Sequence, residues 1–130
     1  MSDSSAHLTH ITSVLLPVAD QDAAIAFYTE VLGFEKRADV PFGDGDRWVE
    51  VAPAGGETAI ALVPPREGWK PGESSAAVGF YSTDIDATHA LLVERGTSVD
   101  GEVMRAGAPV PPLFFLRDPD QNMLLVVGAV

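Results

Sequence analysis

A weak internal repeat, with an offset of 64 residues, is the feature that most constrains how this chain folds. Five residues of one eleven-residue window recur in the second half: Asp20, Asp22, Ala23, Ala26 and Glu30 are matched by Asp84, Asp86, Ala87, Ala90 and Glu94. The strand-like segments 58–63 and 122–127 lie at the same offset. Because two copies of this length nearly fill the 130-residue chain, we expect two similar modules with equivalent positions.

Each copy predicts the same order of elements, β-α-β-β-β. An apolar strand leads to an aspartate that suits a helix N-cap, a helix follows, and a glycine ends it. In the first copy the strand is 10–18, the N-cap is Asp20, the helix is 23–32 and the later strands are 35–41, 47–52 and 58–63. In the second copy the strand is 76–82, the N-cap is Asp84, the helix is 86–95 and the later strands are 98–104, 112–117 and 122–128.

The predicted fold class is therefore α+β, with two tandem β-α-β-β-β modules in a single domain over residues 1–130. Module one is 8–63, a Pro- and Gly-containing linker is 64–75, and module two is 76–128. Neither small unit can bury a sheet alone, so we expect the modules to pack side by side. Helices would cover the outer face, and the sheets would curve around a cleft.

Composition excludes several classes of function. A net charge of −11 with only eight Lys and Arg argues against nucleic acid as a partner. No apolar run approaches the ~20 residues that span a bilayer, so no membrane partner is expected, and the polar first ten residues do not resemble a signal peptide. Cysteine is absent, which excludes disulfides, thiolate ligands and a cysteine nucleophile. These observations favour a cytoplasmic protein.

Two segments carry a resemblance to a known family. The sequence VAD at 18–20 leading into AFYTEVLGF at 26–34, and the sequence FLRDPDQN at 115–122, resemble the vicinal oxygen chelate superfamily. That superfamily includes glyoxalase I, extradiol dioxygenases and bleomycin resistance proteins. Gln121 replaces the glycine of its usual Asp-Pro-Asp-Gly-Asn turn. The resemblance covers nearly the whole chain and implies paired modules, but this fold supports several chemistries and several pure binders.

Enzymes of this superfamily hold a divalent metal with one His, Gln or Glu ligand from each of four strands, and the metal polarises substrate oxygens. The resemblance places the four ligand positions here at Ser13, Ala61, Ala77 and Leu125. Three of these side chains cannot bind a metal, and a serine hydroxyl is a weak ligand. We therefore expect a member that lacks the metal ligands and needs no cofactor.

Other candidate metal ligands have simpler roles. We expect His7, His10 and His89 to lie at the surface. The acidic pairs Asp44/Asp46 and Asp118/Asp120 stand in turns, where aspartate hydrogen-bonds to its own backbone.

Side chains alternate along a strand, so the ligand positions also identify the cleft face. The predicted ligand-binding residues are Ser13, Leu15, Trp48, Glu50, Ala61, Tyr81 and Leu125. Ala59, Gly79 and Met123 are expected on the same face. The alternate, uniformly apolar positions, predicted to pack under the helices, are Val14, Leu16, Val49, Val51, Ile60, Leu62, Val78, Phe80, Leu124 and Val126.

A mostly apolar pocket with a few directional groups is typical of a site for a small organic ligand. Trp48 can stack on a planar or cationic ligand with Glu50 as counter-charge; alternatively, Trp48 fills a gap at the sheet edge and Glu50 faces solvent. Glu50 is also the weak candidate for a general base. Trp69 of the linker either closes over the cleft or anchors its own loop.

The sequence thus favours a metal-free protein that captures a small apolar or aromatic molecule, of the resistance or sequestration type. The alternative is a glyoxalase- or dioxygenase-like enzyme, a lyase or oxidoreductase, that has a displaced metal site or uses Glu50 as general base. The resemblance also implies a homodimer, whose clefts are formed or completed by the partner chain.

Overall fold

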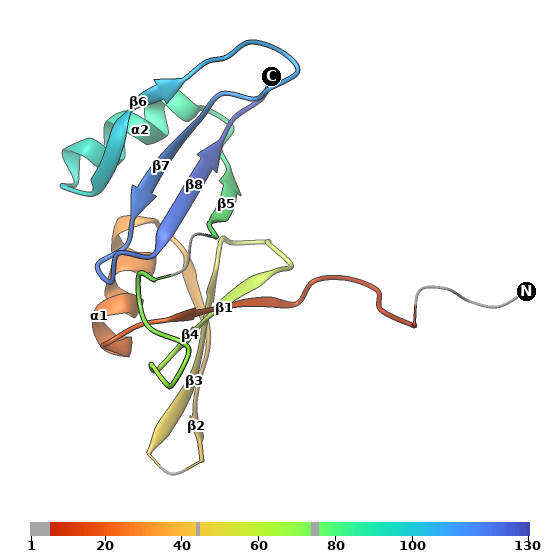
Figure 1. The fold of residues 1–130 in the computed structure, drawn as a ribbon, viewed down its shortest axis with the longest axis vertical. Helices are drawn as coiled ribbons and strands as arrows, with labels where there is room; N and C mark the ends of the chain where they lie inside the picture. Colours follow the sequence, from red (N-terminus) through yellow and green to blue (C-terminus); the bar gives the residue numbers. More distant parts are fainter. Residues whose placement is uncertain (1–5, 44, 74–75) are drawn as a thin grey trace, which may run out of the picture.

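The computed structural model describes residues 6–43, 45–73 and 76–130, which form two consecutive β-α-β-β-β modules (Figure 1). This is the α+β fold that the sequence predicts. The first module contains β1 (Ser13–Pro17), α1 (Gln21–Ala26), a π-helical turn η1 (Phe27–Val31), β2 (Glu35–Phe42), β3 (Asp46–Ala52) and β4 (Ala59–Val63). The second contains β5 (Val78–Tyr81), α2 (Ile85–Glu94), β6 (Ser98–Met104), β7 (Leu113–Arg117) and β8 (Met123–Val127).

The two sheets have the same strand order, which bears out the repeat. The orders are β1-β4-β3-β2 and β5-β8-β7-β6. In each module the first strand pairs in parallel with the last, and the other neighbours are antiparallel. Figure 1 shows the first sheet in the lower half of the molecule and the second sheet in the upper half, with α2 beside it. None of the helices formed by the described residues is long and apolar enough to cross a membrane.

Both predicted N-caps are confirmed, but the first helix differs from its prediction. The Asp20 and Asp84 carboxylates each accept a hydrogen bond from the backbone amide three residues later, at 3.1 Å. The predicted helix over 23–32 is α-helical only to Ala26 and continues as η1. Thr29 donates its hydroxyl to the Ile25 carbonyl at 2.7 Å. That bond competes for the α-helical acceptor and accompanies the wider turn.

The core lies on the helix side of both sheets, as alternation predicts. Burial alternates residue by residue along β7 and β8. The buried members of the predicted helix-side set are Val49, Val51, Ile60, Leu62, Leu124 and Val126. The remaining members, Val14, Leu16, Val78 and Phe80, are half-buried. Phe34 and Phe80 join the modules through an edge-to-face ring contact with centroids 5.1 Å apart.

A buried carboxylate joins the two modules. Asp118, only 2% exposed, accepts the Tyr28 hydroxyl at 2.9 Å, across 90 positions of sequence. Its oxygens also accept the Asn122 side-chain amide at 3.0 Å and the backbone amides of Asp120 and Asn122, both at 2.9 Å. The predicted turn role of Asp118 is thus confirmed, and the partner from the other module is additional. Gln121, in the usual glycine position, adopts a φ of +67°.

The same turn holds the end of β1 and the linker. Asn122 donates to the Pro17 carbonyl at 2.9 Å, and Asp120 accepts the Ala19 amide at 2.9 Å. Gly72 donates its amide to the Asn122 side chain at 3.0 Å. A Cβ on Gly72 would lie 2.9 Å from the Asp120 carbonyl oxygen, so only glycine fits this close approach. We call this set of contacts, centred on Tyr28 and residues 118–122, the inter-module latch.

Removal of the Tyr28 hydroxyl tests the latch. Burial, followed by the nearby Asp118 carboxylate, raises the pKa of Tyr28 far above its usual value, so the phenol remains a donor. Tyr28→Phe leaves the buried carboxylate without one donor and is expected to lower the free energy of unfolding by about 1–3 kcal/mol. Urea unfolding measures the change. Tyr81→Phe, at a residue 64% exposed, is the matched control and is expected to change stability by less than about 0.5 kcal/mol. Equal losses in both variants would contradict the proposed role of the latch.

Candidate functional site

The first sheet carries five of the seven predicted ligand-binding residues, which are Ser13, Leu15, Trp48, Glu50 and Ala61. Leu15 is paired with Ala61, and Ala61 is paired with Glu50, so the three stand in one row across β1, β4 and β3. Trp48 precedes Glu50 by two positions on β3 and therefore shares its face. Ser13 lies beside Ala59 in the same way.

Trp48 and Glu50 are bonded to each other. The indole Nε1 donates to the Glu50 carboxylate at 2.7 Å, and both residues are half-buried. A hydrogen bond to an ionised acceptor is stronger than a neutral one, so the pair holds a definite orientation. One end of this pair offers an aromatic ring, and the other offers carboxylate lone pairs. The sequence analysis paired these two residues only through a shared ligand; in the structure they are also bonded directly to each other.

A hollow of about 200 Å³ lies beside Trp48. Leu15, Val63, Pro64 and Pro65 supply apolar walls, and Asp46, Arg47 and Arg66 also line it. The hollow therefore joins β1, β3 and the start of the linker. The sequence did not indicate the contribution of Pro64 and Pro65, although their position directly after β4 is a signal that could have suggested it.

Ala61 differs from the expected roomy cleft position. It is fully buried, and every residue of β4 is buried. Alternation assigns Ala61 to the Leu15 and Glu50 face, but it does not say what covers a side chain on that face. A ligand reaches the Ala61 methyl group only if a neighbouring side chain moves.

Tyr81 and Leu125 lie on the second sheet. Leu125 is half-buried and stands in one row with Gly79 and Phe115. Tyr81 is mostly exposed and lines a second hollow, of about 300 Å³, together with Ala59 and Gly79. Within one chain, Trp48 and Tyr81 thus line different hollows.

Trp69 anchors its own loop. The Arg66 guanidinium lies 4.1 Å from the centroid of the Trp69 ring, a cation–π contact. The backbones of the same two residues exchange hydrogen bonds of 2.8 and 3.1 Å. Of the two roles open for Trp69, the structure has the anchoring one.

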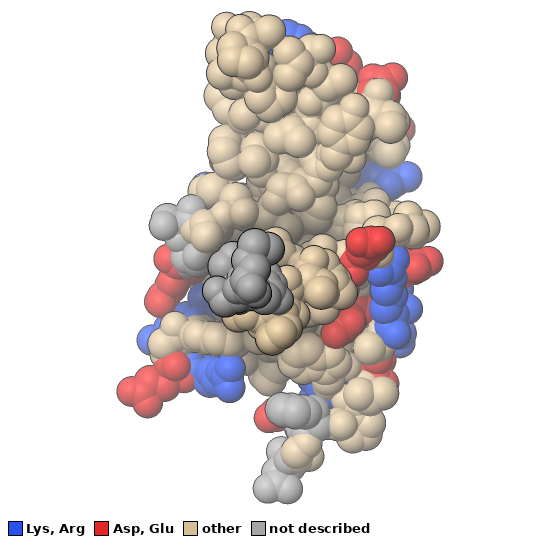
Figure 2. Space-filling view, turned by 90° about the vertical axis from the view of Figure 1, so that its right-hand side faces the viewer, with Lys and Arg blue, Asp and Glu red and all other residues tan. Residues whose placement is uncertain are grey.

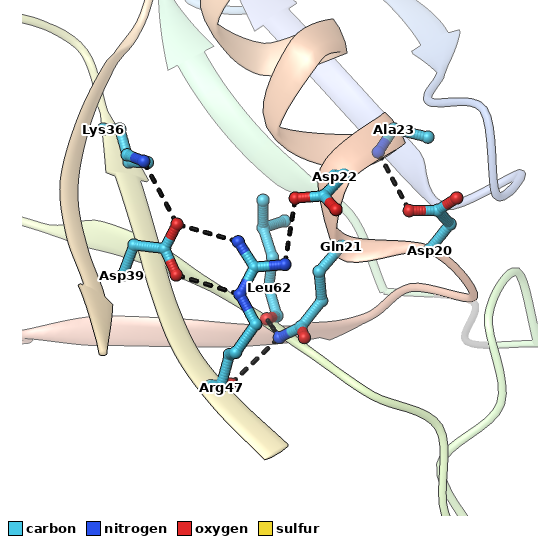
Figure 3. Close-up of polar contacts among 8 residues, drawn as sticks. All are labelled: Asp20, Gln21, Asp22, Ala23, Lys36, Asp39, Arg47 and Leu62. Atoms are coloured by element: carbon cyan, nitrogen blue, oxygen red, sulfur yellow. Dashed lines mark hydrogen bonds and ion pairs between the residues drawn. The ribbon is translucent and has the colours of Figure 1, made fainter. Parts of the chain in front are cut away.

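An ion network braces β3 on the side opposite Trp48. Figure 3 shows the Arg47 guanidinium between two carboxylates: it donates to Asp39 at 2.8 and 3.0 Å and to Asp22 of α1 at 2.9 Å. Lys36 also donates to Asp39, at 3.1 Å. The hydrogen bond from Arg47, followed by that from Lys36, lowers the pKa of Asp39 to about 2. No sequence pattern indicates this network, because its residues come from three separate elements.

Gln21 completes the brace at the start of α1. Its side-chain amide donates to the Arg47 carbonyl at 3.0 Å and to the Leu62 carbonyl at 2.8 Å (Figure 3). One side chain therefore ties β3 and β4 to the helix. Because successive residues point to opposite faces, holding Arg47 against α1 directs Trp48 to the other face.

The side chains at the four predicted ligand positions do not fit the metal that the resemblance implies. Ser13, Ala61, Ala77 and Leu125 offer no imidazole, amide or carboxylate ligand. Among the described residues, no three His, Asp or Glu side chains gather closely enough to hold an ion. His10 hydrogen-bonds to Thr9, and His89 to the Gly101 carbonyl, at 2.8 and 2.7 Å. Asp44, the first member of one acidic pair, lies outside the described residues.

Charge is unevenly distributed on the face of the molecule that Figure 2 draws. In Figure 2, charged side chains gather over the lower half of the molecule, whereas the face of the second module has few of them away from its edges. Exposed apolar side chains of this module include Tyr81, Met104 and Val110. An uncharged surface with exposed apolar groups is typical of a contact or ligand surface.

Comparison with known proteins finds relatives that match nearly the whole chain. Residues 7–126 match the model of the Glyoxalase/Bleomycin resistance protein/Dioxygenase superfamily. The uncharacterized protein YetH of Bacillus subtilis (strain 168) is 34% identical over 121 residues, 92% of this chain and 98% of that protein. TnmS3, an antibiotic binding protein from Streptomyces sp. CB03234, has 34% identity and a TM-score of 0.84, covering 95% of this chain and 98% of its own. A superfamily member from Sphaerobacter thermophilus DSM 20745 has 32% identity and a TM-score of 0.82, covering 93% and 98%.

Acid titration tests the brace behind Trp48. The pKa of Asp39 is lowered on folding, so its ion pair stabilises the folded state above the unfolded pKa of about 4 and loses this effect as pH falls towards 2. Asp39→Asn is expected to be less stable than the wild-type protein at pH 7. The difference should shrink steadily between pH 4 and pH 2, as measured by urea unfolding at each pH. A difference that is independent of pH would contradict the assignment.

Proposed function

The chain belongs to the glyoxalase/bleomycin resistance protein/dioxygenase superfamily, and from this premise we propose that it is a metal-free protein that binds a small apolar or aromatic molecule. The proposed ligand lies against Trp48 and Glu50 on the open face of the first sheet. In the cytoplasm such a protein would lower the free concentration of its ligand, as in resistance or sequestration.

The hydrogen-bonded pair of Trp48 and Glu50 carries this proposal, because Trp48 lines a hollow with largely apolar walls and holds the Glu50 carboxylate beside it. An aromatic face with a fixed carboxylate suits a planar ligand that carries a positive charge or a hydrogen-bond donor. Ser13 and Leu15 would extend the contact along β1. The similarity to TnmS3, described as an antibiotic binding protein, supports a binding role within this family.

We propose that the site is completed in a homodimer. Trp48 and Tyr81 line separate hollows in one chain, so a ligand that contacts both needs the second sheet of a partner. The face of the second module that Figure 2 draws has few charged side chains away from its edges, so it can meet another protein surface at little desolvation cost. In that dimer Tyr81 and Leu125 of one chain would close the hollow beside Trp48 of the other.

An enzymatic role remains the second candidate because the Trp48 indole fixes the Glu50 carboxylate in one orientation. A positioned carboxylate can remove a proton from a bound substrate. Glu50→Gln separates the two functions. If the variant retains ligand binding but loses turnover of that ligand, the protein is an enzyme.

Native mass spectrometry tests the metal and dimer proposals together. The untagged protein is incubated with Ni²⁺, Mn²⁺, Fe²⁺ or Zn²⁺, desalted and measured. We expect the mass of two 13.7 kDa chains without added metal. A dimer with one ion per chain or per dimer would contradict the metal-free proposal and favour the enzyme. A monomer at micromolar concentration would contradict the shared site.

Substitution of Trp48 and Glu50 tests the ligand site, with cationic proflavine and neutral coumarin as planar probes. The starting protein is Trp69→Phe, which leaves Trp48 as the sole tryptophan. Trp48→Leu is expected to weaken binding of both probes by about tenfold or more, through loss of stacking. Glu50→Gln is expected to weaken proflavine binding about tenfold and coumarin binding only slightly, because only proflavine uses the charge. Calorimetry measures all affinities.

Tyr28→Phe is the matched control for these titrations, because its hydroxyl lies in the buried core and not on the ligand face. It should bind both probes as the starting protein does. If Trp48→Leu and Glu50→Gln also bind both probes unchanged, the ligand site lies elsewhere.

A further inference from the structure

A small polar hollow of about 190 Å³ lies where the end of α2 meets the first module. Trp48 is not part of its lining. It is lined by Phe27 and Val31 from the first module and by Arg95, Thr97 and Arg117 from the second. Its volume corresponds to roughly six water molecules. This hollow is distinct from the hollows beside Trp48 and Tyr81, and its chemistry is independent of the proposed function.

Two residues that line this hollow each carry a buried hydrogen-bonding atom without a partner. Among the described residues, Thr97 Oγ1 and Arg117 Nε are the buried side-chain nitrogen and oxygen atoms without a hydrogen-bond partner. Buried polar groups are almost always satisfied, because an unsatisfied one costs free energy on folding. Two such groups on residues of one lining point to a binding partner that the protein itself does not supply.

The neighbouring protein groups do not supply that partner. The backbone amides of Arg95, Gly96 and Thr97 already occupy the carbonyls at the end of α2, at 2.9–3.0 Å. One guanidinium nitrogen of Arg95 donates a hydrogen bond to the Val31 carbonyl, at 2.7 Å. Arg117 forms an ion pair with Asp100 at 3.6 Å, a separation too long for a hydrogen bond. The arginine and threonine donors therefore retain unused capacity.

Charge determines the kind of ligand. The protein has eight Lys and Arg in total, and two of them line this hollow. The one carboxylate in the lining, Asp118, is saturated by its four latch hydrogen bonds. Guanidinium groups bind tetrahedral oxyanions through paired N–H donors, and a hydroxyl can add a third contact.

We propose that this hollow binds a small tetrahedral oxyanion, such as inorganic phosphate or the phosphate group of a small ester, held by Arg95, Arg117 and Thr97. Arg95 already bonds across the module junction to Val31, so the anion draws together groups from both modules. Binding consequently stabilises the folded chain.

Thermal unfolding and calorimetry test this site, with inorganic phosphate titrated at an ionic strength held constant by chloride. Phosphate is expected to raise the melting temperature by several degrees once its concentration exceeds its dissociation constant about 100-fold. Thr97→Val, which keeps the side-chain shape, is expected to weaken phosphate binding about tenfold. Arg117→Met should weaken it further. Asp100→Asn should tighten it, because that variant removes a competing carboxylate.

Arg105→Met is the matched control, because Arg105 is ion-paired with Asp86 outside this hollow. It should retain the wild-type phosphate affinity. Phenyl phosphate distinguishes a free ion from an ester: equal affinity for both shows that the hollow accepts a phosphate group carried on a small molecule. The proposal is overturned if phosphate acts no differently from chloride. It is also overturned if Thr97→Val gains stability without any change in phosphate affinity.

Discussion

The buried carboxylate of Asp118 is the group on which the union of the two modules depends. A carboxylate removed from water is costly unless its oxygens accept hydrogen bonds, and here four bonds satisfy them. Only the Tyr28 hydroxyl comes from the other module, and its raised pKa keeps the proton in place. The neighbouring turn residues then fix the end of β1 and Gly72 of the linker. One orientation of the modules therefore satisfies every member of the latch.

Opposite faces of each sheet have separate tasks in this arrangement. In the first sheet the helix side carries the core and the ionic brace, and the other side carries the groups of the proposed ligand site. Arg47 and Trp48 illustrate the division, because they are adjacent in sequence but point to different faces. Arg47 is held against α1 by Asp22 and Asp39. Trp48 meets Glu50 on the open face. The ion pairs that hold Arg47 on one face thus help to fix the orientation of Trp48 on the other.

The sequence predicts the helices, the strands and the buried faces, but few of the side-chain contacts between distant residues. Alternation assigned Val49, Val51, Leu124 and Val126 to the core, and aspartate chemistry located both helix starts. The hydrogen bond between Trp48 and Glu50 could have been predicted, because residues two apart on a strand share one face. The contact of Tyr28 with Asp118 could not have been predicted, since no periodicity relates positions 90 residues apart. Alternation likewise names the face of Ala61 but not the neighbours that bury it.

The repeat is preserved in the strands but broken at the latch. At the offset of 64 residues, Leu92 occupies the position equivalent to Tyr28, and Ala54 occupies the position equivalent to Asp118. Leu92 is buried in the core, where a phenol hydroxyl would need a partner. A chain assembled from two copies of the first half would lack the carboxylate for its tyrosine. A chain assembled from two copies of the second half would bury that carboxylate without the phenol. The halves have therefore diverged into complementary parts, and neither can now replace the other.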